Sequence, residues 1–376
     1  MTAGIYLHIP FCKSRCSYCD FATDVYKSSD AVERYVNALC EEISNSQEQS
    51  QTAETLVDTI YFGGGTPSLL TQKQVEKILN SIYKKFNIQS DIELTMEMNP
   101  ATVSIETLRD YRSLGVNRAS FGVQTFDDTE LKRLARGHDA NDARQTFRLL
   151  REAGFENVSF DLIAGLPRQT IADWERNLDE AMKLRPEHLS LYLLEIHEGT
   201  PLAEQIRNER QPLPDEDLAA EMYELMLEKI AANGYRQYEI SNFSLPGFES
   251  RHNSKYWLLD PVYAFGVSAH SFDGKRRFSN ERDTAKYVKL IEENGGAVVM
   301  REDVDVASEF IFLGLRLNKG IDLVEYRNRF ETDIEETYRD NLSRLEDSEL
   351  IELTLGNLKL TQKGMLFSNE VFAVFV

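Results

Sequence analysis

The sequence predicts an α/β protein built on a parallel sheet, followed by a smaller α+β region. In the first half of the chain, short runs rich in β-forming residues alternate with amphipathic segments that carry apolar residues at i, i+3 and i+4. Two glycines, Gly115 and Gly154, each follow such an amphipathic segment and precede a β-rich run, which is typical of helix ends. This alternation indicates βαβ units, in which neighbouring strands run parallel.

Six β/α units fit between residue 5 and about residue 205. Their strands are expected at Ile5–Ile9, Thr59–Phe62, Ile92–Met96, Arg118–Val123, Val158–Ile163 and His188–Leu194. The helices between them are expected around the apolar positions of 32–43, 75–86, 108–114, 147–150 and 174–182, and 41–54 is expected to be a polar loop. A closed barrel needs about eight units, so a partial barrel and a doubly wound open sheet are both compatible with this count.

The second half of the chain predicts two further parts. A Pro-rich polar stretch at 211–217 indicates a linker, and helices are expected at 218–233 and 284–294. The last segment predicts helices followed by two short strands, Ile351–Leu355 and Leu358–Thr361, which is the order of a winged-helix-like domain. We therefore expect three domains, with bounds 1–205, 206–300 and 301–376.

Composition excludes several classes of function. The chain has 42 Lys and Arg against 62 Asp and Glu, a net charge of −20, which argues against nucleic acid as a partner. Residues 325–347 of the winged-helix-like region are rich in acidic residues, so a protein contact or a packing role is favoured over DNA. No segment approaches the roughly 20 apolar residues of a transmembrane helix, and no signal peptide is recognisable, so a cytoplasmic protein is expected.

Three of the four cysteines lie within eight residues, immediately after the first predicted strand. Cys12, Cys16 and Cys19 form a C-x3-C-x2-C pattern. A zinc site would ordinarily have a fourth ligand nearby, whereas three thiolates suit an iron–sulfur cube in which one iron keeps an open coordination position. Three coincidental core cysteines are disfavoured in a loop. Cys40 lies on the apolar stripe of the first helix and is expected to be an ordinary buried residue.

With Tyr18 before the last cysteine, this pattern resembles the radical S-adenosyl-L-methionine (SAM) superfamily. The resemblance implies a partial (β/α)6 radical-SAM barrel with a C-terminal α+β extension. It also implies that Cys12, Cys16 and Cys19 bind a [4Fe-4S] cluster. SAM would chelate the open iron, and an electron from the cluster would cleave SAM to a deoxyadenosyl radical.

Polar residues follow the ends of several predicted strands, where barrel proteins place their functional groups. Gly63-Gly64-Gly65-Thr66-Pro67 follows the second strand, and three glycines let the backbone approach a ligand closely. Glu97, Gln124 and Asp161 follow or lie in the next strands. The resemblance implies a SAM pocket made of Tyr6, Gly64, Gly65, Thr66, Glu97, Gln124, Arg136 and Asp161, in which Asp161 suits the ribose hydroxyls and Arg136 the SAM carboxylate.

Longer segments resemble one branch of the superfamily. Ile5–Cys12, Phe62–Pro67, Asp161–Pro167 and Gly266–Ser271 are similar to oxygen-independent coproporphyrinogen III oxidase and its relatives. That oxidase has a further cysteine where this chain has Phe21, and it has a longer segment before the cluster motif. The H-N-x-x-Y-W block at 252–257 instead resembles the HemW-type haem chaperones.

The resemblance therefore implies a haem chaperone on a radical-SAM scaffold, with haem, a [4Fe-4S] cluster and SAM as cofactors. His252 is expected to bind haem, because an imidazole can ligate haem iron and aromatic neighbours can stack on the macrocycle. Expected partners are haem and haem-accepting proteins, and a homodimer is one assembly that the family admits. No residue is assigned a catalytic role. The alternatives are a coproporphyrinogen III oxidase, which Phe21 disfavours, and a zinc-stabilised interaction protein.

Overall fold

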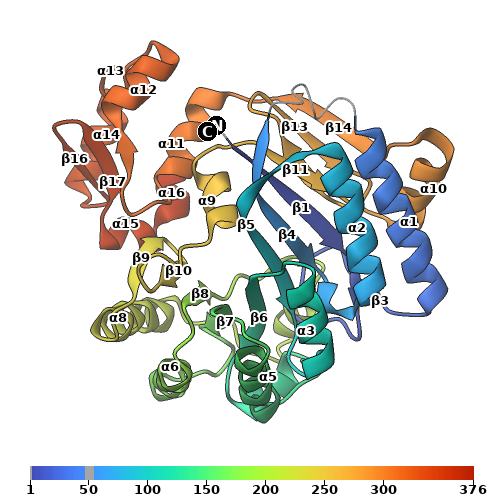
Figure 1. Ribbon diagram of the computed structural model, residues 1–376. Helices are drawn as coiled ribbons and strands as arrows, with labels where there is room; N and C mark the ends of the chain where they lie inside the picture. The colour runs from blue at the N-terminus through green and yellow to red at the C-terminus, as the bar shows by residue number, and fades with distance from the viewer. Residues whose placement is uncertain (1, 47–54) are drawn as a thin grey trace.

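The computed structural model describes residues 2–46 and 55–376 (Figure 1). Its main feature is a twelve-stranded mixed sheet. The six predicted strands are all present, adjacent and parallel in chain order. They are β1 (Ala3–Ile9), β4 (Leu56–Gly64), β5 (Asn87–Met98), β6 (Arg118–Gln124), β7 (Asn157–Ala164) and β8 (His188–Leu193).

The strands added at both sides of this core come from the second half of the chain. Strand β11 (Val262–Phe265) runs parallel to β1, and β12 (His270–Phe272), β13 (Arg276–Asn280) and β14 (Val298–Asp303) continue the sheet in antiparallel order. At the other side, β10 (Asn242–Ser244) and β9 (Arg236–Glu239) follow β8. Because the described edge strands β14 and β9 do not pair with each other, the barrel is partial, as predicted.

Helices cover the outer face of the parallel strands (Figure 1). They are α1 (Ser29–Asn45), α2 (Gln72–Lys85), α3 (Ile105–Ser113), α5 (Ala140–Glu152), α6 (Ile171–Leu184), α8 (Glu216–Ala232) and α10 (Thr284–Asn294). The short helices α4 (Asp128–Arg133) and α7 (Pro201–Arg207) lie beside the cysteine loop, where Ser17 N donates to Leu134 O and Leu202 N donates to Ser17 O. Local sequence fixes where several of them begin: capping boxes Thr71/Gln74, Asp139/Asp142 and Thr170/Asp173 start α2, α5 and α6.

Helix α1 includes residues 41–45, so the prediction of a loop was wrong there. The amphipathic pattern continues through the buried Ile43, and 47–54 lie outside the described residues.

The strands alternate between two environments. In β1, Ile5, Leu7 and Ile9 are fully buried in the hydrophobic core shared with the helices. Tyr6 and His8 have the opposite parity and contact other polar residues of the barrel interior, including Tyr61. The interior is therefore lined with polar side chains, while the apolar core lies between sheet and helices.

The short helix α9 (Arg251–Trp257), which carries the H-N-x-x-Y-W block, closes the barrel at the end where the parallel strands begin (Figure 1). We call this end the barrel floor and the opposite end, which carries Cys12, the cluster end. The Glu93 carboxylate accepts hydrogen bonds from the backbone N–H groups of Arg251 and His252, both at 3.0 Å, and Lys255 Nζ lies 2.7 Å from Asp58. A carboxylate at a helix N-terminus satisfies its free donors.

The C-terminal part has its own buried cluster, centred on Ile311, Ile321 and Leu358. Its helices are α11 (Val306–Gly314), α12 (Leu323–Phe330), α13 (Ile334–Thr337), α14 (Arg339–Asp347), α15 (Gln362–Leu366) and α16 (Ser368–Phe372). Its strands are β15 (Ile321–Asp322), β16 (Ile351–Thr354) and β17 (Asn357–Leu360). The predicted order of helices followed by a β-ribbon is present. Within the described ranges, no helix is both long and apolar enough to cross a bilayer.

Candidate functional site

The three clustered cysteines lie on a loop that leaves the cluster end of β1. Strand β2 (Phe11–Cys12) pairs in parallel with β3 (Asp24–Val25), which closes the loop carrying Cys16 and Cys19. A backbone hydrogen bond of 2.9 Å from Ser17 N to Leu134 O ties the loop to the barrel. All three cysteines are partly exposed.

Two side chains from other elements donate hydrogen bonds to these sulfurs. Thr66 Oγ1 lies 3.5 Å from Cys12 Sγ, and Arg136 Nη1 lies 3.3 Å from Cys16 Sγ. Such donors stabilise thiolates and tune an iron–sulfur centre. Among the described residues, no three Cys, His, Asp or Glu side chains converge as they would around one metal ion. Three thiolates suit an iron–sulfur cube in which each binds a separate iron, whereas a zinc ion ordinarily takes a fourth ligand.

The glycine turn after β4 is packed directly against the start of the cluster loop. Gly65 N donates to Ile9 O at 2.8 Å, and a Cβ on Gly65 would lie 2.7 Å from the carbonyl carbon and oxygen of Pro10. Gly64 has φ +109°, and a Cβ there would lie 2.7 Å from the His8 ring. Glycine is therefore required at both positions by sterics.

Glu97 links this turn to the barrel interior. Its carboxylate accepts hydrogen bonds from Tyr61 Oη at 2.7 Å and from Gly64 N at 3.0 Å. Burial raises the pKa of Glu97 to about 7, against the lowering effect of the Tyr61 hydrogen bond. The negative charge of Asp161 raises this pKa further. A buried carboxylate of this kind is suited to an ammonium ligand, whose charge would favour the ionised form.

If SAM is the ligand, as the resemblance implies, this pKa predicts that its affinity depends on pH. Near pH 6 the Glu97 carboxyl is mostly protonated and near pH 8 mostly ionised, and a cationic ligand prefers the ionised form. Affinity for SAM should therefore rise on the order of tenfold across this interval. Calorimetry at several pH values measures it. Glu97→Gln should bind SAM more weakly and lose most of the dependence, and an unchanged slope in that variant would contradict the assignment.

Arg136 holds three parts of the site together. Besides Cys16, its guanidinium donates to Asn99 Oδ1 at 3.0 Å and to Gly122 O at 2.5 Å. Asn99 in turn donates to Thr66 Oγ1 at 2.7 Å. Arg136 thus connects the cluster loop to β5 and β6, and it is positioned for an anionic group at this end of the barrel.

Asp161 and Gln124 complete the set that was predicted for the cluster end. Asp161 lies opposite Gly122 in the β6–β7 pair. Burial raises the pKa of Asp161 to about 6, against a hydrogen bond from Ser190 and the charges of Arg118 and Arg136. Gln124 is buried with φ +67°, a conformation that bends the chain at the end of β6.

Several residues of this site were not predicted. Tyr61 and Arg118 face the interior from the same side of their strands as Thr59 and Ser120, and Asn99 bridges Thr66 and Arg136. Arg118 is 1% exposed, its Nε has no hydrogen-bond partner among the described residues, and its charge lowers the pKa of Asp161. Strand parity relative to Tyr6 and Glu97 is the signal that could have identified Tyr61 and Arg118.

Tyr6 and His252 lie deeper in the barrel than the other predicted residues. The Tyr6 ring stacks at 6.1 Å from Tyr61 and 6.4 Å from His252. His252 is 1% exposed, with Nδ1 at 2.8 Å from Thr59 Oγ1 and Nε2 at 3.4 Å from Tyr256 Oη. Burial lowers the pKa of His252 to about 3, so the ring is neutral. His252 therefore lies beneath the aromatic residues of the interior, away from the cysteines, and its binding of haem stays a prediction.

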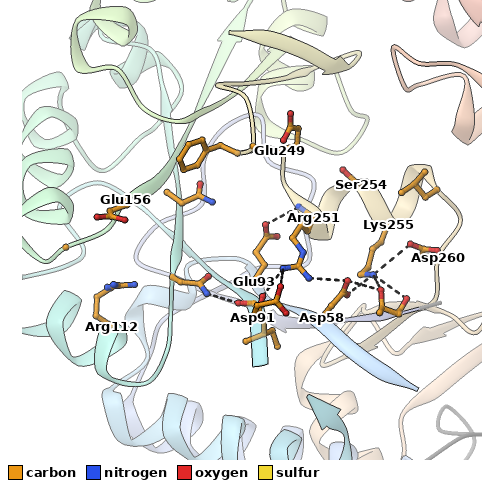
Figure 2. A pocket seen from close by; sticks show the side chains of 18 residues that line it. Asp58, Asp91, Glu93, Arg112, Glu156, Glu249, Arg251, Ser254, Lys255 and Asp260 are labelled. Carbon is orange, nitrogen blue, oxygen red and sulfur yellow. Dashed lines mark hydrogen bonds and ion pairs between the residues drawn. The ribbon is translucent and has the colours of Figure 1, made fainter. Parts of the chain in front are cut away.

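A cavity of about 680 Å³ lies at the barrel floor, beside α9 (Figure 2). Six carboxylate residues line it, against the three cationic residues Arg112, Arg251 and Lys255. Figure 2 shows that Arg251 and Lys255 already interact with Asp58, Asp91 and Asp260. The cavity is thus acidic, and two of its three cationic side chains are already paired.

Comparison with known proteins shows which families the chain resembles. A model of the radical SAM superfamily matches residues 6–181, and a model of the HemN C-terminal domain matches residues 303–367. A protein named heme chaperone HemW from Bacillus subtilis (strain 168) is 37% identical, over 99% of this chain and 98% of its own length. The protein of the same name from Escherichia coli (strain K12) is 32% identical over 99% and 98%.

A solved structure shares the fold. Coproporphyrinogen III oxidase (HemN) from Escherichia coli, described as a radical SAM enzyme, superposes with a TM-score of 0.87. The match covers 100% of this chain and 90% of that one, at 23% sequence identity. At this identity the likeness establishes the architecture and carries no assignment of substrate.

Proposed function

The chain belongs to the HemW family of the radical SAM superfamily, and from this we propose that it binds haem and delivers it to acceptor haemoproteins. The observation that carries the proposal is the identity of 30–37% to proteins named heme chaperone HemW, which extends over nearly the whole chain for most of them. The partners would be haem and proteins that accept it.

The proposal includes a [4Fe-4S] cluster on Cys12, Cys16 and Cys19, and SAM beside it. SAM, when bound, would supply a deoxyadenosyl radical on reduction by the cluster. In this proposal Glu97 accepts from the SAM ammonium and Arg136 faces its carboxylate. Asp161 and Gln124 would contact the nucleoside, and the Gly64–Thr66 turn and Tyr6 would shape the pocket around it.

His252 is included in the proposal as a haem-binding residue of the H-N-x-x-Y-W block. Both ring nitrogens lie within hydrogen-bond distance of Thr59 and Tyr256, so iron ligation would require α9 to move away from β4. His252→Ala should therefore weaken the Soret band of the haem complex. An unchanged band, in a variant that remains folded by circular dichroism, would remove His252 as a ligand.

The decisive experiment is haem transfer. The anaerobically reconstituted protein, loaded with haem, should convert an apo-haemoprotein to its holo form, followed by the absorption of the acceptor, with and without SAM. The same preparation, given coproporphyrinogen III, SAM and an electron donor, should release no CO₂ at enzymatic rates. Rapid CO₂ release without haem transfer would instead support an oxidase.

A further inference from the structure

The six histidines of the chain differ sharply in accessibility. Four are buried and have a ring nitrogen within hydrogen-bond distance of the protein: His8, His138, His188 and His252. Two are exposed: His197, in the loop after β8, and His270, the first residue of β12. An imidazole can ligate the iron of an incoming haem without structural change only if its ring nitrogen is accessible. The folded protein therefore offers His197 and His270.

The two exposed imidazoles, those of His197 and His270, differ in the charged groups around them. His197 lies 3.6 Å from Glu195 and is followed in the chain by Glu198, and carboxylates repel the two propionates of haem. Burial is the main cause that lowers the pKa of His270. The positive charges of Arg277 and, more weakly, Arg282 lower this pKa further, whereas the negative charge of Glu302 raises it. This shift favours the neutral imidazole that iron ligation requires. Arg277 lies on the same face of β13 as Ser279, the residue opposite His270.

Arg282 is the more exposed of these two cations, with 66% of its side chain exposed against 30% for Arg277. At the edge of the cluster loop it donates to Asp20 O at 2.9 Å and pairs with the Asp20 carboxylate at 3.3 Å, so a propionate would share Arg282 with Asp20. Arg277 is instead held by both carboxylate oxygens of Glu309, at 2.9 and 2.6 Å. An exposed guanidinium presents a planar set of donors that fits a carboxylate.

An exposed aromatic ring lies on the same rim. Phe21 is 66% exposed, which is unusual for a large apolar side chain. Its neighbours in the chain are fixed on both sides, since Arg282 binds Asp20 and His8 Nε2 lies 2.8 Å from Ala22 O. His270 is close enough to His8 to lower its pKa. Arg282, through Asp20, and His270, through its electrostatic effect on His8, are thus both linked to the segment that carries Phe21.

The strand register brings a second candidate iron ligand, the thioether of Met300, to the same face of the sheet as His270. His270 lies directly opposite Ser279 on β13, and Ser279 lies opposite Met300 on β14, so the three side chains share one face of the sheet. Met300 is 39% exposed. Two strand spacings place it on the order of 10 Å from His270 across the small Ser279. A thioether is a haem ligand when paired with histidine.

We propose that His270 is the residue that first binds haem iron, on the rim formed with Phe21, Arg282 and Met300. This rests on the proposed haem-chaperone function and adds the site. The iron forms a coordination bond to a ring nitrogen of His270, Arg282 binds a propionate, and Phe21 covers part of the macrocycle. The floor cavity of about 680 Å³ is one alternative site, and its six carboxylate residues disfavour a dianionic ligand (Figure 2).

The test is a titration with haemin under anaerobic conditions, followed by the Soret band and by electron paramagnetic resonance. His270→Ala should weaken binding by on the order of tenfold or more and change the axial-ligand signature. His197→Ala is the matched exposed control and should bind as the native protein does. Met300→Leu should change the spin state with a smaller loss of affinity. Iron-free protoporphyrin IX should bind equally to His270→Ala and the native protein, because it has no iron to ligate.

The outcomes separate this inference from the function on which it rests. If the native protein binds no haemin, the proposed function fails. If it binds haemin, and His270→Ala binds equally well with an unchanged spectrum, the inference is overturned and the function stands. Loss of the band in His252→Ala alone would place the ligand on α9 instead. His270 is exposed, so its variants should keep the native melting temperature, which calorimetry checks first.

Discussion

Replacing Cys12, Cys16 or Cys19 by serine is expected to leave the reconstituted protein without its [4Fe-4S] cluster. A hydroxyl is a much poorer iron ligand than a thiolate, and three thiolates are the fewest that leave a single open iron. Each variant should lose the brown colour and the bound iron and sulfide almost completely. Absorption spectra and chemical analysis of iron and sulfide measure this, and SAM binding should fall with the cluster.

Cys40→Ser is the matched control. Cys40 lies on α1, where it packs against the hydrophobic core and takes no part in the loop that carries the other three. It is only partly buried, which is less than the sequence pattern predicted. Its serine variant should retain iron, sulfide and colour. Retention of the cluster in any one of the three loop variants, or stoichiometric zinc in the native protein, would contradict the assignment.

Gly65→Ala is expected to disrupt the site by a purely steric route. The new Cβ would lie 2.7 Å from the Pro10 carbonyl group and 2.9 Å from Ile9 O, and these backbone atoms cannot move without shifting the start of the cluster loop. Overpacking of this kind costs about 1–3 kcal/mol of stability. The displaced loop should also lose most of its cluster and SAM binding. Urea unfolding and SAM titration measure the two effects separately.

Gly296→Ala provides the control for this substitution. A Cβ on Gly296 would meet nothing within 4 Å, so the variant should unfold within about 0.5 kcal/mol of the native protein. It should also bind SAM normally. If Gly65→Ala matched Gly296→Ala in both stability and SAM affinity, the close packing of the glycine turn against the cluster loop would not matter for function.

Much of the fold could be predicted because its signals are local. All six parallel strands lie where the β-rich runs are, since the period of side-chain exposure depends on a few consecutive residues. The end of α1 was misplaced because Glu41–Asn45 looked polar while Ile43 continued the buried stripe. The strands β9–β14 were not predicted, because short strands that complete a sheet depend on partners far away in the chain.

At the cluster end, some residues could be predicted from local sequence, but their contacts could not. Glu97 and Asp161 could be chosen because the ends of parallel strands meet at one edge of a sheet, and Arg136 through the family resemblance. The contacts of Arg136 with Cys16, Asn99 and Gly122 could not be predicted, because they join segments up to 120 residues apart.

By itself, the sequence determined the parallel strands, the three-cysteine loop and the family, because strand periodicity and ligand spacing are properties of short segments. Only the tertiary structure decided which histidines are accessible. His252 stands out in the sequence, yet α9 buries it against Thr59, while the inconspicuous His270 is exposed beside Arg282. Exposure and local charge depend on what packs against a residue from elsewhere in the chain, and no local pattern of residues encodes that.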